Sequence, residues 1–205
     1  MAVNSAHAQL GSEFDEFPED PVSLLRRWFE LAVPRGVREP GALALATVAR
    51  SGRPSSRMVQ LSRITGRGIV FATHAGSRKG IEFAETGRWA GTFYWRETNQ
   101  QISLAGHVER LGDAEADALW AVRPAPANAM SVATRQSELL TDERELLDRA
   151  RSLEQAGPLE RPSTWLAYEL VADEVEFWQS SPDRLYRRLR YDLDGTGWTA
   201  RRLQP

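Results

Sequence analysis

The chain has 205 residues, of which 41% are hydrophobic and 26% charged, and its formal net charge is −2. This balance is typical of an ordinary globular protein and excludes the strongly basic surface that attracts nucleic acid. The sequence has no cysteine, which excludes disulfides, thiolate metal sites and a cysteine nucleophile. Its three histidines, His7, His74 and His107, lack metal-ligand spacing, so we expect no bound metal.

The absence of a membrane span and of a signal peptide indicates the cellular compartment. No apolar run reaches the length of a membrane span, and the first twenty residues lack the basic start and apolar core of a signal peptide. We therefore expect a cytoplasmic protein that binds neither membrane nor nucleic acid. Residues 1–19, which include most of an acidic run, are expected to form a flexible acidic arm ahead of a single domain at 20–205.

A helix is expected to open this domain. Asp20 can act as the N-cap and Pro21 suits the first helical position, after which apolar residues recur at helical spacing. Strand-like runs then follow at short intervals, at 42–49, 55–63, 69–73, 89–95 and 101–110. Short polar links join most of them, which predicts antiparallel hairpins. A short helix, capped by Ser77 and ended by Gly87, is expected after the third run.

The second half of the chain is expected to begin with helices and then to return to strands. The segment 113–153 has a mostly helical pattern with a break at 123–126, and strands are expected at 165–171, 175–179 and 198–203. Strands at hairpin distance with a few inserted helices are typical of an antiparallel barrel rather than an alternating βαβ fold. We therefore predict a mainly β fold with helical additions, in the α+β class.

The segment 76–80 is the first candidate for a binding site. It lies between a predicted strand and a predicted helix, where unpaired N–H groups and the adjacent cations Arg78 and Lys79 suit a phosphate. The segment lacks the spacing of a P-loop. Taken alone, it is more simply explained as a capped helix with solvated basic residues.

Arg57 is the second candidate. On a strand it shares one face with Val59 and Leu61, and a cation among apolar neighbours needs an anionic partner. A salt bridge to a carboxylate is the simpler alternative to a bound ligand. A third group of donors lies at 135–137, where a helix cap is the alternative.

The fourth candidate follows the aromatic pair at 177–178. If the segment is a strand, Arg184, Tyr186 and Arg188 share one face, and the alternative is a surface strand with cation–π contacts. No paired carboxylates and no serine–histidine–acid arrangement stand out. Such a set of cations and amides suits a charged cofactor that brings its own reactivity.

The order of these segments resembles that of the pyridoxamine-phosphate oxidase family. The matching segments are Arg57-Met58-Val59, Phe71-Ala72-Thr73, Ser77-Arg78-Lys79, Gln100-Gln101, Gly106 to Leu111, Arg123-Pro124, Arg135-Gln136-Ser137, Val175 to Trp178 and Arg184 to Arg188. The resemblance covers nearly the whole chain. It implies an antiparallel split β-barrel that forms a homodimer and binds FMN at the subunit interface.

The resemblance also implies which positions contact FMN. They are Arg57, Met58, Val59, Gln60, Leu61, Thr73, Ser77, Arg78, Lys79, Gln101, Gln136, Ser137, Trp178 and Arg188. The basic side chains can form charge-assisted bonds to a phosphate dianion, and the amides can contact the polar edge of the flavin. Because the flavin performs the chemistry, no catalytic side chain is predicted.

Departures from the family pattern concern the substrate. The vitamin B6 oxidases hold the substrate phosphate with a lysine, a tyrosine, an arginine and a serine, and the matching positions here are Ser62, Leu119, Arg123 and Ala127. A later arginine–x–histidine pair is matched by Arg184 and Tyr186. Each lost charged contact costs on the order of 1.5–3 kcal/mol, so we expect poor binding of pyridoxine phosphate.

Other segments resemble the phenazine-biosynthesis branch of the family more closely. They are 36–40, 71–75, 94–97 and 130–131. This branch oxidises a partly reduced, carboxylated phenazine precursor to the aromatic phenazine, and we expect that reaction here, with dioxygen as electron acceptor. The candidate substrate contacts are Ser62, Arg123, Arg184 and Tyr186. The alternatives are a pyridoxine/pyridoxamine 5'-phosphate oxidase, a deazaflavin-binding protein and a non-catalytic flavin- or haem-binding split barrel.

Overall fold

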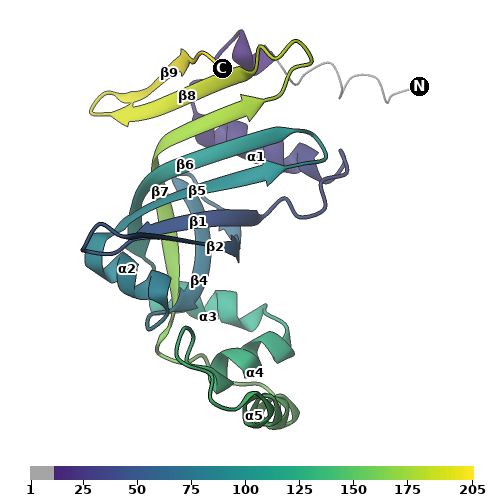
Figure 1. Cartoon of the computed structure of the whole chain (residues 1–205), viewed down its shortest axis with the longest axis vertical. Helices are drawn as coiled ribbons and strands as arrows, with labels where there is room; N and C mark the ends of the chain where they lie inside the picture. The colour runs from purple at the N-terminus through teal and green to yellow at the C-terminus, as the bar shows by residue number, and fades with distance from the viewer. Residues whose placement is uncertain (1–11) are drawn as a thin grey trace.

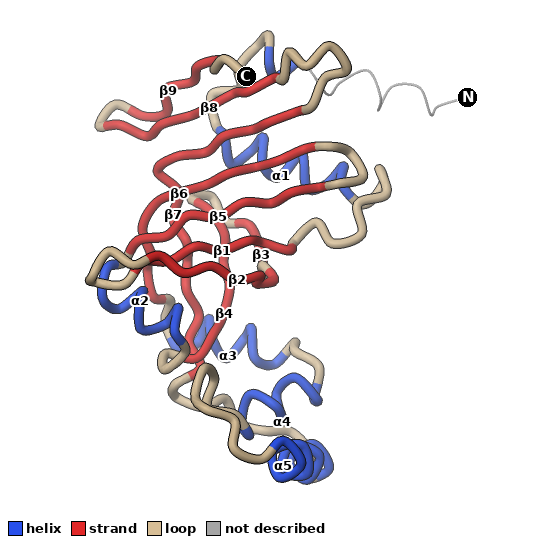
Figure 2. Tube along the Cα trace, in the orientation of Figure 1, coloured by secondary structure: helices blue, strands red, loops and turns tan. Residues whose placement is uncertain are grey.

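The computed structural model describes residues 12–205, and strands dominate this part of the chain (Figures 1 and 2). The strands are β1 Ala42–Val48, β2 Pro54–Gln60, β3 Arg63–Ile64, β4 Gly68–His74, β5 Arg88–Trp95, β6 Gln100–Arg110, β7 Trp165–Gln179, β8 Arg187–Asp194 and β9 Gly197–Arg202. They form one sheet in the order β2-β1-β5-β6-β7-β4-β3, with β8 paired to β7 and β9 to β8. Every described pairing is antiparallel, so the predicted antiparallel α+β class is confirmed.

Helices are inserted between the strands at a few places. They are α1 Pro21–Ala32, α2 Arg78–Thr86, α3 Asp113–Ala121, α4 Ala125–Ala133 and α5 Glu143–Gln155, with a short 3₁₀ helix at Ser12–Phe14. The predicted caps are confirmed: the Asp20 carboxylate accepts hydrogen bonds at the start of α1, and the Ser77 hydroxyl accepts one from the backbone N–H of Gly80 in α2. Figure 1 shows α3, α4 and α5 gathered at the opposite end of the molecule from β8 and β9.

Two apolar clusters hold these elements together. In the larger one, α1 packs its buried face on the sheet, and the Trp28 ring meets the Phe177 ring edge-on at 5.1 Å. The smaller cluster joins α3 to the start of β7 through Trp120 and Trp165, whose ring centroids lie 5.2 Å apart. This smaller cluster lies beside the candidate site, so packing there sets the position of the site residues.

The expected arm at 1–19 falls partly outside the described residues. In the described part, Glu13 and Phe14 are 2% exposed, and the Trp28 indole N–H donates to the Glu13 carboxylate at 2.9 Å. Arg202 also donates to the backbone oxygen of Phe14 at 2.7 Å. The packed part of the chain therefore begins before the expected boundary at residue 20.

The strands expected at 165–171 and 175–179 are one continuous strand, β7, and the prediction of two strands was wrong. A bulge explains the apparent break: Ala105 pairs with Glu174 while Gly106 pairs with Ala172, which leaves Asp173 as the extra residue. A Cβ atom on Gly106 would meet the Val171 backbone oxygen at 2.0 Å, so glycine is required at this close approach. Beyond the bulge, β7 exchanges its neighbour β4 for β8.

Two other local predictions differ from the structure. The interpretation of 184–188 as a strand was wrong, because β8 begins only at Arg187 and Arg184 has a left-handed φ of 63°. The Asp183 carboxylate accepts from the Leu185 backbone N–H at 2.9 Å and so closes a turn there. The helical stretch 113–153 is broken twice, once before α4 as expected and again between α4 and α5.

Candidate functional site

A cleft of about 910 Å³ is bounded by β2, β4, the start of α2, the end of α3 and the start of β7. This volume is of the size that binds small molecules. The predicted cofactor residues that line the cleft are Arg57, Met58, Val59, Gln60, Leu61, Thr73, Arg78, Lys79, Gln136 and Ser137. Ser62 and Arg123, two of the predicted substrate contacts, line the same cleft. Ser77 is buried beneath it, where its hydroxyl caps α2.

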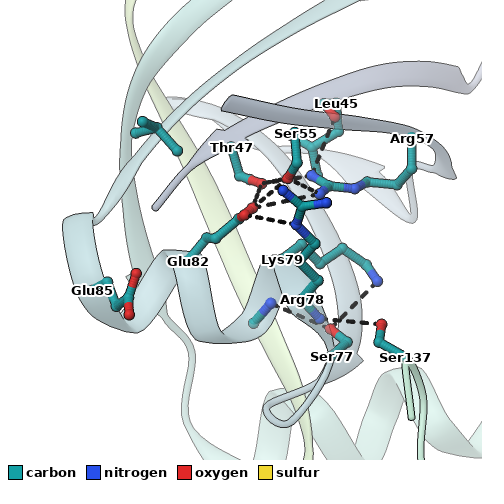
Figure 3. A network of polar contacts seen from close by, with 12 residues as sticks. Leu45, Thr47, Ser55, Arg57, Ser77, Arg78, Lys79, Glu82, Glu85 and Ser137 are labelled. Carbon is teal, nitrogen blue, oxygen red and sulfur yellow. Dashed lines mark hydrogen bonds and ion pairs between the residues drawn. The ribbon is translucent and has the colours of Figure 1, made fainter. Parts of the chain in front are cut away.

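Arg57 lies on the half-buried face of β2, as the alternation of the strand predicts. Its Nη1 donates to the Thr47 hydroxyl at 2.6 Å and its Nη2 to the Ser55 hydroxyl (Figure 3). Nη2 also lies 3.5 Å from the Glu82 carboxylate. Burial lowers the pKa of Arg57, although Glu82 opposes the shift. The carboxylate partner that the sequence left as an alternative is therefore present, and it is part of the same site.

Glu82 is the carboxylate at the centre of this network (Figure 3). Its side chain projects from α2 and is 4% exposed. It accepts hydrogen bonds from the Thr47 hydroxyl, from the Ser55 hydroxyl at 2.5 Å and from Arg78 Nε at 3.0 Å. Burial opposes its ionisation, but these hydrogen bonds outweigh burial and lower the pKa of Glu82 to about 2. Glu82 is therefore ionised across the physiological range.

Lys79 is buried, with 8% exposure, and the described residues offer it no carboxylate within ion-pair distance. Its Nζ contacts two neutral oxygens, the Ser77 hydroxyl at 3.4 Å and the Gln136 side-chain oxygen at 3.3 Å. Burial, and secondly the charge of Arg57, lower the pKa of Lys79 to about 8. A buried cation without a counter-charge is costly unless an anion binds beside it.

The loop between α4 and α5 closes the cleft over the start of α2. The Gln136 side-chain oxygen accepts from the Thr73 hydroxyl at 3.0 Å, and the Ser137 hydroxyl accepts from the backbone N–H of Arg78 at 3.2 Å. Ser137 has a φ of 77°, a left-handed conformation that is strained for a residue with a side chain. The loop thus reaches a backbone N–H at the helix N-terminus, where an anion is favoured.

Arg123 is the second cation of the cleft without a carboxylate partner among the described residues. Its guanidinium carbon lies 5.3 Å from the Trp120 ring centroid and 5.0 Å from that of Trp165. Its Nη1 donates to the Asn128 side-chain oxygen at 3.0 Å and to the Ser131 hydroxyl at 3.1 Å. Burial lowers the pKa of Arg123. Aromatic faces and neutral acceptors hold the guanidinium in place but leave its charge for a ligand.

His74, at the end of β4, is affected by the charges of both Arg123 and Lys79. Its Nε2 is buried without a hydrogen-bond partner among the described residues. Burial, then Arg123 and then Lys79, hold the pKa of His74 below its ordinary value.

Residues 12–205 contain no cluster of three metal-binding side chains and no helix long and apolar enough to cross a membrane.

The remaining predicted residues form a second group away from the cleft. Gln101 pairs with Trp178 on the β6–β7 ladder, and Trp178 pairs with Arg188 across β7 and β8. The Trp178 and Tyr186 ring centroids lie 5.1 Å apart, and Arg184 is exposed in the preceding turn. Along β7, Trp178 is separated from Trp165 of the cleft by roughly 40 Å of extended chain.

Arg188 differs from the cations of the cleft because its charge is already matched. Its Nε and Nη2 donate to the two oxygens of the Glu176 carboxylate at 2.7 and 3.0 Å. This bidentate pair raises the pKa of Arg188. Among the described residues the partner of Arg188 is thus a carboxylate, and the cation–π contacts of the predicted alternative are not found for it.

Several site residues were missed by reasoning from the sequence. Thr47, Ser55 and Glu82 surround Arg57, and Trp120 and Trp165 support Arg123. One signal was available: Glu82 follows Arg78 at i+4, on the buried face of the predicted helix. Ser55 and Trp120 also lie only two and three residues from the arginines that they contact, whereas the contacts with Thr47, Glu82 and Trp165 join residues far apart in the sequence, which no local pattern indicates.

Two family models together match most of the chain. The family described as pyridoxamine 5'-phosphate oxidase matches residues 29–156, and the C-terminal dimerisation region of pyridoxine 5'-phosphate oxidase matches residues 165–205. The second match supports assembly as a homodimer.

Individual relatives agree with these matches. Dihydrophenazinedicarboxylate synthase of Pseudomonas chlororaphis is 48% identical over 194 residues, which are 94% of this chain and 87% of the relative. Pyridoxine/pyridoxamine 5'-phosphate oxidase of Rubrobacter xylanophilus is 39% identical, over 97% of this chain and 93% of the relative. The crystal structure of PhzG from Burkholderia lata 383 in complex with tetrahydrophenazine-1-carboxylic acid is 47% identical and superposes with a TM-score of 0.92, covering 94% of this chain and 96% of that one. The chain therefore belongs to the pyridoxamine 5'-phosphate oxidase family.

Proposed function

We propose that the chain is an FMN-dependent oxidase of phenazine biosynthesis, which converts a partly reduced, carboxylated phenazine precursor to the aromatic phenazine. The observation that carries this proposal is the pair Lys79 and Arg123, two cations that line one cleft without a carboxylate partner among the described residues. Two such cations favour two anionic groups. The phosphate of FMN and a substrate carboxylate provide them.

The properties of the cleft fit an FMN phosphate. The positive end of the helix dipole at the start of α2 favours an anion, and Arg78 and Lys79 add positive charge beside it. In the proposed arrangement, these groups and Ser137 bind the phosphate, while Thr73 and Gln136 contact the polar part of the cofactor. When bound, FMN supplies the chemistry, by accepting a hydride equivalent from the substrate and returning the electrons to dioxygen. The protein binds, orients and shields the reactants.

The substrate class is supported by relatives and by the cleft. Two of the most similar curated relatives are named dihydrophenazinedicarboxylate synthase, and the similar solved structure is a complex with tetrahydrophenazine-1-carboxylic acid. Ser62 and Leu119 of the cleft provide no cation for a substrate phosphate. Arg123 remains, and one guanidinium packed against two indole rings suits the carboxylate of a flat aromatic molecule.

The second group of predicted residues requires a second subunit in this proposal. Gln101, Trp178 and Arg188 do not line the cleft of their own chain. We place them, with the substrate contacts Arg184 and Tyr186, on the partner's side of an FMN site at the dimer interface. Because Glu176 neutralises Arg188, we expect this side to act through Arg184 and through the aromatic rings of Trp178 and Tyr186.

The decisive experiment follows the flavin spectrum of the purified protein. Anaerobic addition of a reduced phenazine carboxylate should bleach the visible flavin bands, and admission of air should restore them with formation of the aromatic product. Pyridoxine 5'-phosphate is the comparison substrate and should give a much lower kcat/KM. A bound flavin that neither substrate bleaches would contradict the proposal, and faster turnover of pyridoxine 5'-phosphate would assign the chain to the vitamin B6 oxidases.

A further inference from the structure

The buried carboxylate of Glu82 is unexpected in a site proposed to bind a phosphate. A negative charge beside an anionic ligand weakens binding unless it performs another task. Glu82 lies on α2 one turn after Arg78 and accepts hydrogen bonds from β1 and β2 as well as from its own helix. The cofactor assignment gives this residue no role.

The donors around Glu82 show what the carboxylate does. Arg57 and Arg78 are close enough that the charge of Arg78 lowers the pKa of Arg57, so the two guanidinium groups repel each other. Glu82 lies between them, with one oxygen 3.5 Å from Arg57 Nη2 and the other 3.0 Å from Arg78 Nε (Figure 3). The carboxylate thus allows two like charges to remain side by side before any ligand arrives.

The two arginines are engaged to different degrees. Both terminal nitrogens of Arg57 already donate to protein oxygens. Arg78 donates to Glu82 through Nε alone, and the described residues offer no acceptor to its terminal nitrogens. The hydrogen bond from Nε to Glu82 fixes the orientation of the planar guanidinium, so that both terminal nitrogens can donate to one phosphate.

We propose that Glu82 is a positioning residue that braces Arg57 and Arg78 for the cofactor phosphate, an inference that rests on the proposed function. Together Arg57, Arg78, Lys79 and Glu82 carry a net charge of +2, which matches a phosphate dianion. Thr47 and Ser55 belong to the brace, because each hydroxyl contacts both Arg57 and Glu82. The brace acts on the phosphate end of the cofactor only.

The test compares two flavins that differ only in the phosphate. In Glu82→Gln, the affinity of apoprotein for FMN should fall by roughly 10- to 100-fold, the equivalent of one charge-assisted hydrogen bond. The affinity for riboflavin should stay unchanged. Quenching of flavin fluorescence measures both. Glu85→Gln is the matched control, since Glu85 lies on the same helix and accepts from the Arg50 backbone N–H outside the brace.

The possible results separate the alternatives. An equal loss of FMN and riboflavin affinity would assign Glu82 to folding alone, and unchanged or tighter FMN binding would show that it is no brace; either result overturns the inference. If Glu82→Gln does not fold, Thr47→Val removes a hydroxyl from the same network and should give the same selective loss. Wild-type protein that fails to prefer FMN to riboflavin would refute the proposed function as well, whereas a normal preference that Glu82→Gln retains would refute the brace only.

Discussion

Lys79 is the residue whose surroundings say most about the ligand of the cleft. The side chain is buried, its partners are neutral oxygens, and burial lowers its pKa to about 8. A phosphate dianion beside it favours the protonated form, so binding above this pH requires uptake of a proton. The affinity for FMN should therefore depend on pH in a range where phosphate itself no longer titrates.

We predict that FMN binding weakens as the pH rises. As pH rises above 8, Lys79 loses its proton in the free protein, and the FMN dissociation constant should rise by up to about tenfold per pH unit. Titrations between pH 7 and pH 9.5 measure it. Lys79→Arg should bind FMN without this slope, because a guanidinium stays charged throughout. The same slope in that variant would assign the titration to another group.

At the residue scale, the sequence identifies the cations of the site but not which of them are neutralised by a carboxylate. Arg57, Arg78 and Lys79 are found from a strand pattern and a helix start. The sequence does not reveal that Glu82 forms an ion pair with Arg57, whereas Lys79 has no carboxylate partner among the described residues. Those pairings depend on which strand packs against α2, and this is decided by tertiary contacts.

At the scale of elements, hairpins and caps are predictable, while bulges and turns are less so. The Ser77 cap and the Gly87 end of α2 follow local rules and are confirmed. The division of β7 was wrong because one extra residue, Asp173, interrupts the alternation without ending the strand. The turn at Arg184 was missed because it depends on a hydrogen bond from the Leu185 backbone N–H to the Asp183 carboxylate. The alternation of residues on a strand, from which the prediction was made, does not reveal such a contact.

Helix α4 provides an element-scale prediction, because it holds Arg123 in place from outside the cleft. Asn128 accepts from Arg123 at 3.0 Å and donates to the Trp120 backbone oxygen at 3.1 Å, which ties α4 to α3. Asn128→Ala should raise the KM for the carboxylated substrate roughly 2- to 10-fold, the range expected for one neutral hydrogen bond, with little change in kcat.

Steady-state kinetics and flavin titration test this prediction together. The FMN affinity of Asn128→Ala should match that of wild type, because Asn128 does not line the cleft. Ser131→Ala removes the other acceptor of Arg123 Nη1 and should shift KM in the same direction. A loss of kcat with an unchanged KM would mean that Arg123 does not bind the substrate carboxylate.

For the whole molecule, the main feature is the placement of two groups of candidate residues at opposite ends of β7. Trp165 begins the strand in the cleft, and Trp178 lies near its other end beside Arg188. The region that carries the second group, 165–205, matches the dimerisation region of the family. The order of the motifs in the sequence indicates both groups, but only the folded structure shows that they lie apart within one chain.

If the FMN site is shared between two subunits, as proposed, this division can be tested by complementation between two variants. A chain carrying Lys79→Ala would be defective in its cleft, and a chain carrying Trp178→Ala would be defective in the surface it offers to its partner. Each variant alone should be inactive, yet a mixed dimer would contain one site built from two intact halves. Co-expression in equal amounts should therefore restore about a quarter of wild-type activity, since half of randomly paired dimers are mixed and each has one of its two sites complete. If each site were built within one chain, the two defects would fail to complement in any mixture.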